Sequence, residues 1–467
     1  MQQFPLESPG WLRLKGSRRT RHLVTGEKYW MPESKEGSTP GSHTFTKALA
    51  VVGAGALLLH GARFALSAFG PARPYRLQEN DLETDSQEFV DRLSCVTDAL
   101  LYRDTRIAVL KNGPEFYPAE LAAIDSAEKC INLEAYEFLE GDLTREVVHR
   151  LAARARQGVQ VRLVIDAIGS FGTRKSYFQP LLAAGGRVAW YHPINWKEWP
   201  EFDHRTHRKM LIIDGKLGFI GGADYADHWI ENKDGKLPWR DTVLRVEGGV
   251  VGSLTTVFAE NWIDADGEIL FNSTQFPPER PAGDKTCMVI MSSAGYSTSR
   301  ARVLFQTLLE SARSTIQITS PYFLPDRSVR HSLERAVRER GVKVQVLTAG
   351  ANTDYGSVRR LSEAMSASLI RAGVEFYEYQ PSMIHAKLMT IDGLWTVAGS
   401  TNFDHRSFAL NDEVNLAAFD PETAGCIEKH FKEDLQQSQL LTVKELRSSG
   451  WGERLFADIS WVFRGEE

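Results

Sequence analysis

Residues 207–214 read HRKMLIID and residues 385–392 read HAKLMTID, and these two stretches lie inside a longer internal repeat. Four further blocks recur in the same order, at offsets between 178 and 188 residues. The pairs are INLEAYEF (131–138) with IQITSPYF (316–323), RQGVQVRLVID (156–166) with RERGVKVQVLT (338–348), LLAAGGRVAWYHP (181–193) with LIRAGVEFYEYQP (369–381), and FIGGAD (219–224) with VAGSTN (397–402). The near-constant offset predicts two tandem copies of one unit, each about 180 residues long.

The pattern inside each copy predicts how the chain folds. Stretches with helical periodicity alternate with short β-branched runs, which is the β-α-β alternation of a layered sheet with helices on its faces. We therefore expect an α/β fold made of two tandem α-β-α sandwich units, residues 106–270 and 290–440. Two related units would pair about a pseudo-twofold axis and bring both copies of the repeated motif to one cleft. A single unit would supply only half a site.

The composition limits the possible functions. The 467 residues are 42% hydrophobic and 25% charged, which is ordinary for globular domains and excludes a disordered chain. The four cysteines are too widely spaced for a CxxC pair, which excludes a zinc ribbon and a thioredoxin-like redox site. Lys and Arg number 55 against 60 Asp and Glu, so the chain has no positive excess with which to hold a long nucleic acid.

The first part of the sequence differs from the rest. A basic segment, residues 1–47, precedes 23 largely apolar positions at 48–70. A helix of that length can span a bilayer, so we expect a transmembrane anchor, while Arg63 leaves an interfacial amphipathic helix or a cleaved signal as alternatives. Basic residues before the span favour an N-terminus in the cytoplasm. We expect a linker at 71–105 and a C-terminal tail at 441–467.

Each copy of the repeat carries a histidine and a lysine two residues apart, His207 with Lys209 and His385 with Lys387. Side chains two apart on an extended strand point to the same face, so each imidazole shares its space with an ammonium group. This combination suits a phosphoryl group, because the imidazole can attack phosphorus or carry a proton while the lysine holds a nonbridging oxygen. A lone His-x-Lys is usually a surface feature, but its recurrence at equivalent places of a repeat favours a functional site.

Glycine-containing turns follow both motifs. They lead to Asp224 in the first copy and to Ser400 and Asn402 in the second. Glycine permits close approach of the backbone, and hydroxyl and amide groups can donate to the oxygens of a phosphate. We therefore expect these three side chains to contact the substrate.

These motifs resemble the HKD signature of the phospholipase D superfamily, which the chain matches twice, and within that superfamily the bacterial cardiolipin synthases. The resemblance covers about residues 115–435. The supporting stretches are LAARARQGVQVRLVIDAIGS (151–170), DHRTHRKMLIIDGKLGFIGG (203–222), PWRDTVLRVEG (238–248), TSPYFLP (319–325) and GSTNFDHRSFALNDEVN (399–415). The last stretch is the most specific, because RSFxLNxExN distinguishes the synthases better than the HKD signature does.

The resemblance implies a phosphatidyltransferase that works in two steps and needs no metal and no cofactor. His207 would attack the phosphorus of one phospholipid, with phosphatidylglycerol as the expected substrate, and His385 would protonate the alcohol that leaves. His385 would then take the proton from the hydroxyl of a second lipid, which displaces His207. Lys209, Lys387 and Asn402 would stabilise the charge on the phosphoryl oxygens.

The resemblance also implies one orienting acid for each histidine. In the second copy Glu413 lies 28 residues after His385, and in the first copy Asp241 lies 34 residues after His207. Taken within each copy, these distances assign Glu413 to His385 and Asp241 to His207.

Two further aspartates complete the signature. Asp214 and Asp392 are counted among the catalytic residues, although their position before Gly215 and Gly393 equally fits a cap on the turn at the end of a strand.

One position departs from the cardiolipin synthases, which usually carry Asn where this chain has Asp224. A carboxylate there would repel a phosphodiester unless it were protonated or paired with Lys209. The departure keeps open a phospholipase D that transfers the phosphatidyl group to water, and a nuclease of the same superfamily is a weaker alternative. The expected partners are phospholipids and the membrane, with no nucleic acid, and the expected location is the bacterial inner membrane, as a single-pass or peripheral protein.

Overall fold

The structure is a computed structural model that describes residues 75–444, except 79, 194–203, 231–236, 279, 295–298 and 355. By its internal contacts the chain divides into Met1–Leu59 and His60–Glu467, and every described residue belongs to the second unit. The basic segment 1–47, the helix expected at 48–70 and most of the expected tail lie outside the described residues. In the part of the chain that is described, no helix has both the length and the apolar character needed to cross a bilayer.

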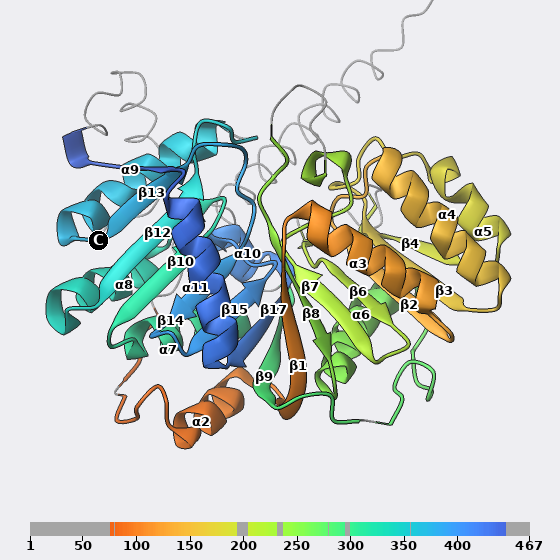
Figure 1. Ribbon diagram of the computed structural model, residues 1–467, viewed down its shortest axis with the longest axis horizontal. Helices are drawn as coiled ribbons and strands as arrows, with labels where there is room; N and C mark the ends of the chain where they lie inside the picture. Colours follow the sequence, from red (N-terminus) through yellow and green to blue (C-terminus); the bar gives the residue numbers. More distant parts are fainter. Residues whose placement is uncertain are drawn as a thin grey trace, which may run out of the picture. The chain divides into compact units, whose positions relative to one another are not determined.

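A continuous 16-stranded sheet forms the centre of the described chain (Figure 1). In the first half the strand order is β1-β8-β7-β6-β2-β3-β4, and in the second half it is β9-β17-β15-β14-β10-β12-β13-β18. The first-half strands are β1 (Leu101–Lys111), β2 (Cys130–Ala135), β3 (Gln160–Asp166), β4 (Arg187–Tyr191), β6 (Met210–Ile213), β7 (Leu217–Gly221) and β8 (Thr242–Glu247). The second-half strands are β9 (Lys285–Ser292), β10 (Thr315–Thr319), β12 (Lys343–Ala349), β13 (Glu375–Tyr379), β14 (Leu388–Ile391), β15 (Trp395–Gly399), β17 (Asn411–Phe419) and β18 (Ser438–Leu440).

The two strand orders correspond position by position from β1 and β9 out to β4 and β13, with β18 added at one edge. The halves join where β1 pairs with β9 in antiparallel fashion, with a shift in register between Tyr102 and Thr105. The predicted α/β fold is confirmed, and the matching strand orders are what a duplicated unit requires.

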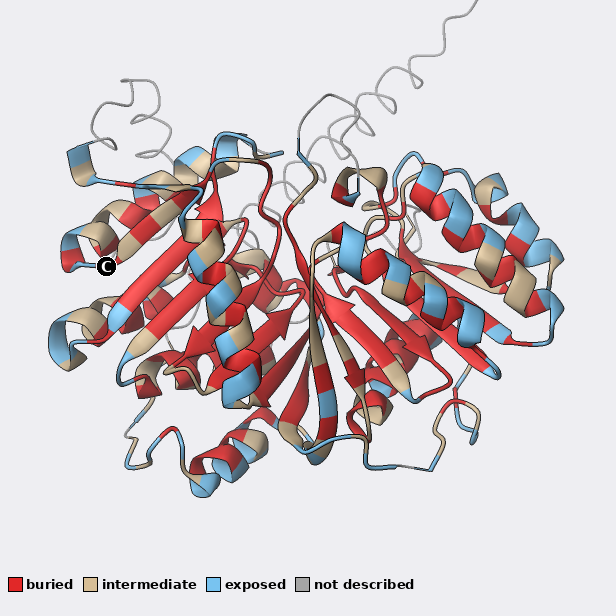
Figure 2. Cartoon of the chain, in the orientation of Figure 1, coloured by how far each residue is buried: buried red, intermediate tan, exposed pale blue. Residues whose placement is uncertain are grey.

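Helices cover both faces of the sheet, because the strands have apolar side chains on both faces, as in β6. Its side chains alternate, so that Leu211 and Ile213 enter the core shared with α3, α4 and α5, whereas Met210 and Ile212 enter the core shared with α6. Figure 2 shows the strands as almost entirely buried, with exposed residues on the outer sides of the helices. The main helices are α3 (Gly113–Ser126), α4 (Asp142–Arg156), α5 (Gln179–Ala183), α6 (Val250–Asp266), α7 (Arg300–Ser311), α8 (Arg327–Arg340), α9 (Gly356–Ala372) and α11 (Pro421–Leu435).

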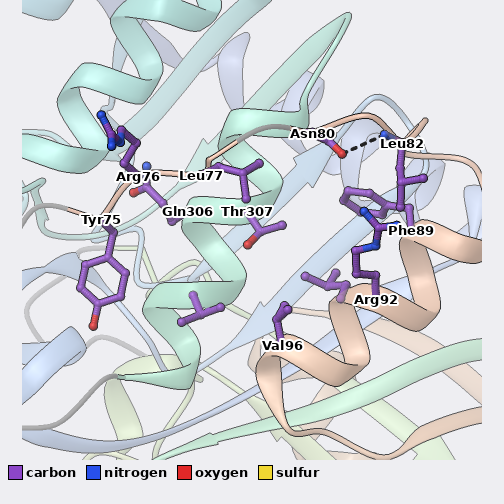
Figure 3. A pocket seen from close by; sticks show the side chains of 12 residues that line it. Tyr75, Arg76, Leu77, Asn80, Leu82, Phe89, Arg92, Val96, Gln306 and Thr307 are labelled. Atoms are coloured by element: carbon purple, nitrogen blue, oxygen red, sulfur yellow. Dashed lines mark hydrogen bonds between the residues drawn. The ribbon is translucent and has the colours of Figure 1, made fainter.

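The stretch expected as a linker, 71–105, is largely structured. It contains α2 (Gln87–Thr97) and the beginning of β1. The side chains of Phe89, Val90 and Leu93 lie on one face of α2 and are buried in the core of the second half. A pocket of about 280 Å³ lies between α2, α7 and residues 75–82, and none of the predicted site residues lines it (Figure 3).

Candidate active site

Each histidine of the repeated motif is held by backbone pairing with the other half of the chain. His207 follows β5 (Arg205–Thr206), which pairs in parallel with the start of β17, and its N–H donates to the carbonyl of Asp412 at 2.9 Å. In the same way Ile384 forms a bridge with Arg240, and the N–H of His385 donates to the carbonyl of Arg240 at 2.7 Å. The backbone of each motif histidine is therefore hydrogen-bonded to a residue from the other half of the chain.

This pairing between the halves decides which acid contacts which histidine. Nδ1 of His207 lies 3.0 Å from Oε1 of Glu413, and Nδ1 of His385 lies 3.0 Å from Oδ2 of Asp241. The assignment of one acid to the histidine of its own copy is therefore wrong. Its physical reason is the backbone pairing, because each acid directly follows the residue whose carbonyl accepts the histidine N–H.

The lysines of the motif lie beside their own histidines. Nζ of Lys209 donates to the carbonyl of His207 at 2.8 Å, and Nζ of Lys387 donates to the carbonyl of His385 at 2.6 Å. Nζ of Lys387 also lies 2.9 Å from Nε2 of His385. All four residues are buried, with exposed fractions of 8% or less.

The charges of the site act across both halves. Burial lowers the pKa of His207, and the charges of Lys209 and Lys387 lower this pKa further. Burial and the charge of Lys387 lower the pKa of His385 to about 3, and Lys209 contributes in the same direction. Because each lysine acts on both imidazoles, the two motifs form one shared site.

The two orienting acids have different electrostatic surroundings. Burial raises the pKa of Glu413 to about 7. For Asp241 burial acts in the same direction, but its hydrogen bond with His385 and the charges of His385 and Lys387 hold its pKa below the ordinary value. Each acid can fix the proton of its histidine on Nδ1, which leaves Nε2 as the nitrogen that faces a substrate.

The three residues expected to contact the substrate have distinct roles in the structure. Oδ2 of Asp224 lies 3.1 Å from Nζ of Lys209, so the carboxylate is paired in the way that the sequence analysis required. Oγ of Ser400 donates to Glu413 and accepts from the N–H of Val414, so this hydroxyl holds an acid in place. Oδ1 of Asn402 is buried and has no hydrogen-bond partner among the described residues, which leaves it available to a ligand.

The structure places Asp214 and Asp392 away from the histidines, at the far ends of β6 and β14. The carboxylate of Asp214 accepts the backbone N–H groups of Glu128, Lys129 and Cys130 at 2.7 to 2.9 Å. Asp392 accepts those of residues 313–315 in the second half. Both aspartates have a positive φ, 54° and 55°, which fits the turn cap and not a catalytic role.

Replacing Asp214 with Ala is expected to destabilise the protein without slowing the chemistry. The substitution leaves three backbone N–H groups without their acceptor and should lower the free energy of unfolding by roughly 2 to 4 kcal/mol. Denaturant unfolding measures this loss, and Asp214→Asn, which keeps one acceptor oxygen, should lose less. A tenfold fall in turnover per folded molecule would contradict the structural role.

Sequence reasoning missed the aromatic side chains that pack on the two imidazoles. The ring of Tyr136 lies 5.3 Å from that of His207, and the rings of Trp229 and Trp239 lie 5.4 and 5.5 Å from that of His385. Nε1 of Trp229 also donates to Asp241 at 3.2 Å. Tyr136 directly follows the end of β2. Ligands of open α/β sheets bind at the carboxyl ends of parallel strands, so the position of Tyr136 after this strand could have indicated it.

Comparison with known proteins agrees with this geometry. The family model described as "Cardiolipin synthase, PLD-like domain" matches residues 121–233 and 305–435, and each range contains one histidine-lysine motif. The chain belongs to this family. The resemblance to the phospholipase D superfamily and its bacterial cardiolipin synthases is thereby confirmed.

Relatives of the cardiolipin synthase family match most of the chain. The probable cardiolipin synthase YwiE of Bacillus subtilis is 32% identical over 362 residues, which is 77% of this chain and 72% of that protein. Cardiolipin synthase A of Pseudomonas fluorescens is 32% identical over 347 residues, 74% of this chain and 72% of that protein. The crystal structure of phosphatidylserine synthase from Haemophilus influenzae shares the fold, with a TM-score of 0.64 at 14% identity over 80% of this chain and 98% of that one.

Proposed function

We propose that this protein is a phosphatidyltransferase of the cardiolipin synthase type, which transfers a phosphatidyl group from phosphatidylglycerol to the hydroxyl of a second phospholipid. The observation that carries the proposal is the pair of buried imidazoles, each with an acid 3.0 Å from Nδ1 and a lysine of its own motif beside it. The names of the relatives support the same activity.

The reaction uses one histidine as nucleophile and the other as acid and base. Nε2 of His207 attacks phosphorus, the bond from phosphorus to the headgroup oxygen breaks, and that oxygen takes a proton from Nε2 of His385. In the second step the acceptor hydroxyl gives its proton to His385 and attacks phosphorus, and the phosphorus–nitrogen bond breaks. The charge of a bound phosphodiester raises the pKa of a neighbouring imidazole, which favours the protonated His385 of the first step.

The lowered pKa of His207 suits its role as nucleophile. A histidine must be neutral to attack phosphorus, and burial keeps His207 neutral at physiological pH. Lys209 and Lys387 are buried, both act on the two imidazoles, and their ammonium groups can donate to the nonbridging oxygens, as can Nδ2 of the buried Asn402.

Activity is expected to survive the removal of divalent cations. Because two lysines supply the positive charge at the phosphoryl oxygens, the turnover number in excess EDTA should stay within about twofold of its untreated value. Turnover measured in EDTA and again after addition of Mg²⁺ tests this. Complete loss on chelation, reversed by the metal, would refute the assignment of the lysines.

The products of phosphatidylglycerol decide between transfer and hydrolysis. We expect purified protein in phosphatidylglycerol vesicles to release glycerol and to form a lipid with four acyl chains. Phosphatidic acid as the main product would instead establish a phospholipase D, in which water displaces His207. Cleavage of DNA without any lipid product would refute both.

We further propose that the protein acts at the surface of the bacterial inner membrane. The loop after β3 presents the side chain of Phe171, which is 80% exposed. The same loop is fixed to the site, because Ser170 donates to the carbonyl of Tyr136, whose ring packs on His207. An exposed aromatic side chain beside the site suits the headgroup region of a bilayer.

Substitution of Phe171 by Glu is expected to weaken binding to phospholipid vesicles. Loss of the apolar contact and addition of a negative charge should lower the partition coefficient roughly tenfold. Vesicle sedimentation measures the partition coefficient. Leu182→Glu, which makes the same change at an exposed apolar residue of α5, is the control. Equal binding by native protein and the Phe171 variant would exclude this loop as a membrane contact.

A further inference from the structure

A glutamate that the reaction does not use lies beside the catalytic groups. Glu137 is two residues beyond β2, and its backbone N–H, like that of Tyr136, hydrogen-bonds the carboxylate of Asp224. Its carbonyl accepts the N–H of Tyr225 at 3.0 Å. The backbone of Glu137 is thus fixed directly against the Lys209–Asp224 pair.

The side chain of Glu137 faces the charged centre of the site. It is 30% exposed, and burial and the charge of Asp224 raise its pKa to about 7 while the charges of Lys209 and Lys387 oppose this shift. Among the described residues its carboxylate accepts no hydrogen bond, and its closest ionic contact is Nε2 of His228 at 3.9 Å. Nε2 of His228 is itself buried without a hydrogen-bond partner in the described chain.

His228 lies on the His385 side of the site, and Glu137 reaches it from the Lys209–Asp224 pair. The ring of His228 lies 4.2 Å from that of Trp229 and 3.9 Å from that of Trp239. Both indole rings pack on His385. His385 is the residue that exchanges a proton with the leaving or attacking alcohol, so the headgroup of that alcohol lies on this side.

The corresponding positions of the second half carry different chemistry. The repeat aligns Glu137 with Tyr322, whose hydroxyl donates to Asp354. It aligns His228 with Arg406, whose positive charge lowers the pKa of His207. A carboxylate and a neutral imidazole therefore line the His385 side, whereas a cation acts on the His207 side.

We infer that Glu137 and His228 bind the hydroxyl groups of the alcohol headgroup and select a neutral polyol such as glycerol. A carboxylate accepts hydrogen bonds from hydroxyl groups, and the unpartnered Nε2 of His228 supplies a second polar contact. The inference rests on the proposed function and specifies the substrate of the same site.

The test compares two phospholipid donors that differ only in the headgroup. Phosphatidylglycerol offers two free hydroxyl groups and phosphatidylmethanol offers none, while the phosphodiester is the same. The Glu137→Leu variant is expected to lower kcat/KM for phosphatidylglycerol roughly 10- to 100-fold, and to change kcat/KM for phosphatidylmethanol by less than about threefold. Glu137→Gln, which keeps an acceptor oxygen, should lose less than Glu137→Leu does.

The controls separate this inference from the proposed function. Glu146→Gln changes an exposed glutamate of α4 and should leave both donors unaffected. An equal loss on both donors in folded Glu137→Leu protein would overturn the inference and leave the proposed function intact. Turnover of neither donor by the native protein would overturn both.

Discussion

The His207→Ala variant is expected to lose at least about 10⁴-fold in turnover with phosphatidylglycerol, because it lacks the nucleophile that divides the transfer into two steps. It should also form no phosphoryl adduct. In the native protein such an adduct is expected to be labile in acid and stable in alkali, as a phosphohistidine is. Turnover assays and rapid quench with a donor labelled in the phosphate measure both effects.

The assignment of the nucleophile needs its own controls. His331→Ala, on the exposed side of α8, should retain native turnover and adduct formation. His385→Ala should also lose turnover with phosphatidylglycerol, since no acid remains for the leaving alcohol. Retained turnover in His207→Ala, or an adduct mapped to His385, would reverse the roles of the two histidines.

The parts of the fold that the sequence predicted are those that depend on local pattern. The short apolar runs of β6 and β14 predicted buried strands, and the near-constant offset between the repeats predicted a duplicated unit. The spacing of His207 and Lys209 predicted that the two side chains share one space, although both residues lie between β5 and β6 and not within one strand. These signals depend on period and distance along the chain, so they can be read without knowledge of tertiary contacts.

The pairing of each orienting acid with the histidine of the other half could not be predicted from local sequence pattern. A duplicated sequence has the same internal distances whether Glu413 contacts the histidine of its own copy or that of the other. The choice depends on β5 pairing with β17, a contact between strands about 200 residues apart. The role of Asp214 was open for a similar reason, since the N–H groups of residues 128–130 that donate to its carboxylate come from a distant segment.

Helix α2, inside the expected linker 71–105, was not predicted because it has only one narrow apolar face. Phe89, Val90 and Leu93 are buried against the second half, and the rest of the helix is polar. Glu137 was missed because a single acid after a strand has no signature of its own. Only the contact of its backbone with Asp224 and its closeness to His228 distinguish it.

The exchanged pairing predicts opposite behaviour for two variants of the orienting acids. Glu413→Gln and Asp241→Asn are each expected to lower turnover with phosphatidylglycerol roughly 10²- to 10⁴-fold, because each removes the charge that fixes a histidine tautomer. A phosphatidyl ester of p-nitrophenol separates them, since its leaving group departs at neutral pH without a proton. Asp241→Asn impairs only the acid, so it should release the first equivalent of nitrophenol at nearly the native rate.

Glu413→Gln impairs the nucleophile, so the release of nitrophenol should stay slow even with the activated donor. Stopped-flow absorbance records the first turnover, and Glu146→Gln, at an exposed position of α4, is the control for the loss of a carboxylate elsewhere. If each acid served the histidine of its own copy, Asp241→Asn would be the slow variant and Glu413→Gln the one rescued. The order of the two rates therefore tests whether the catalytic pairs are formed between the halves of the chain.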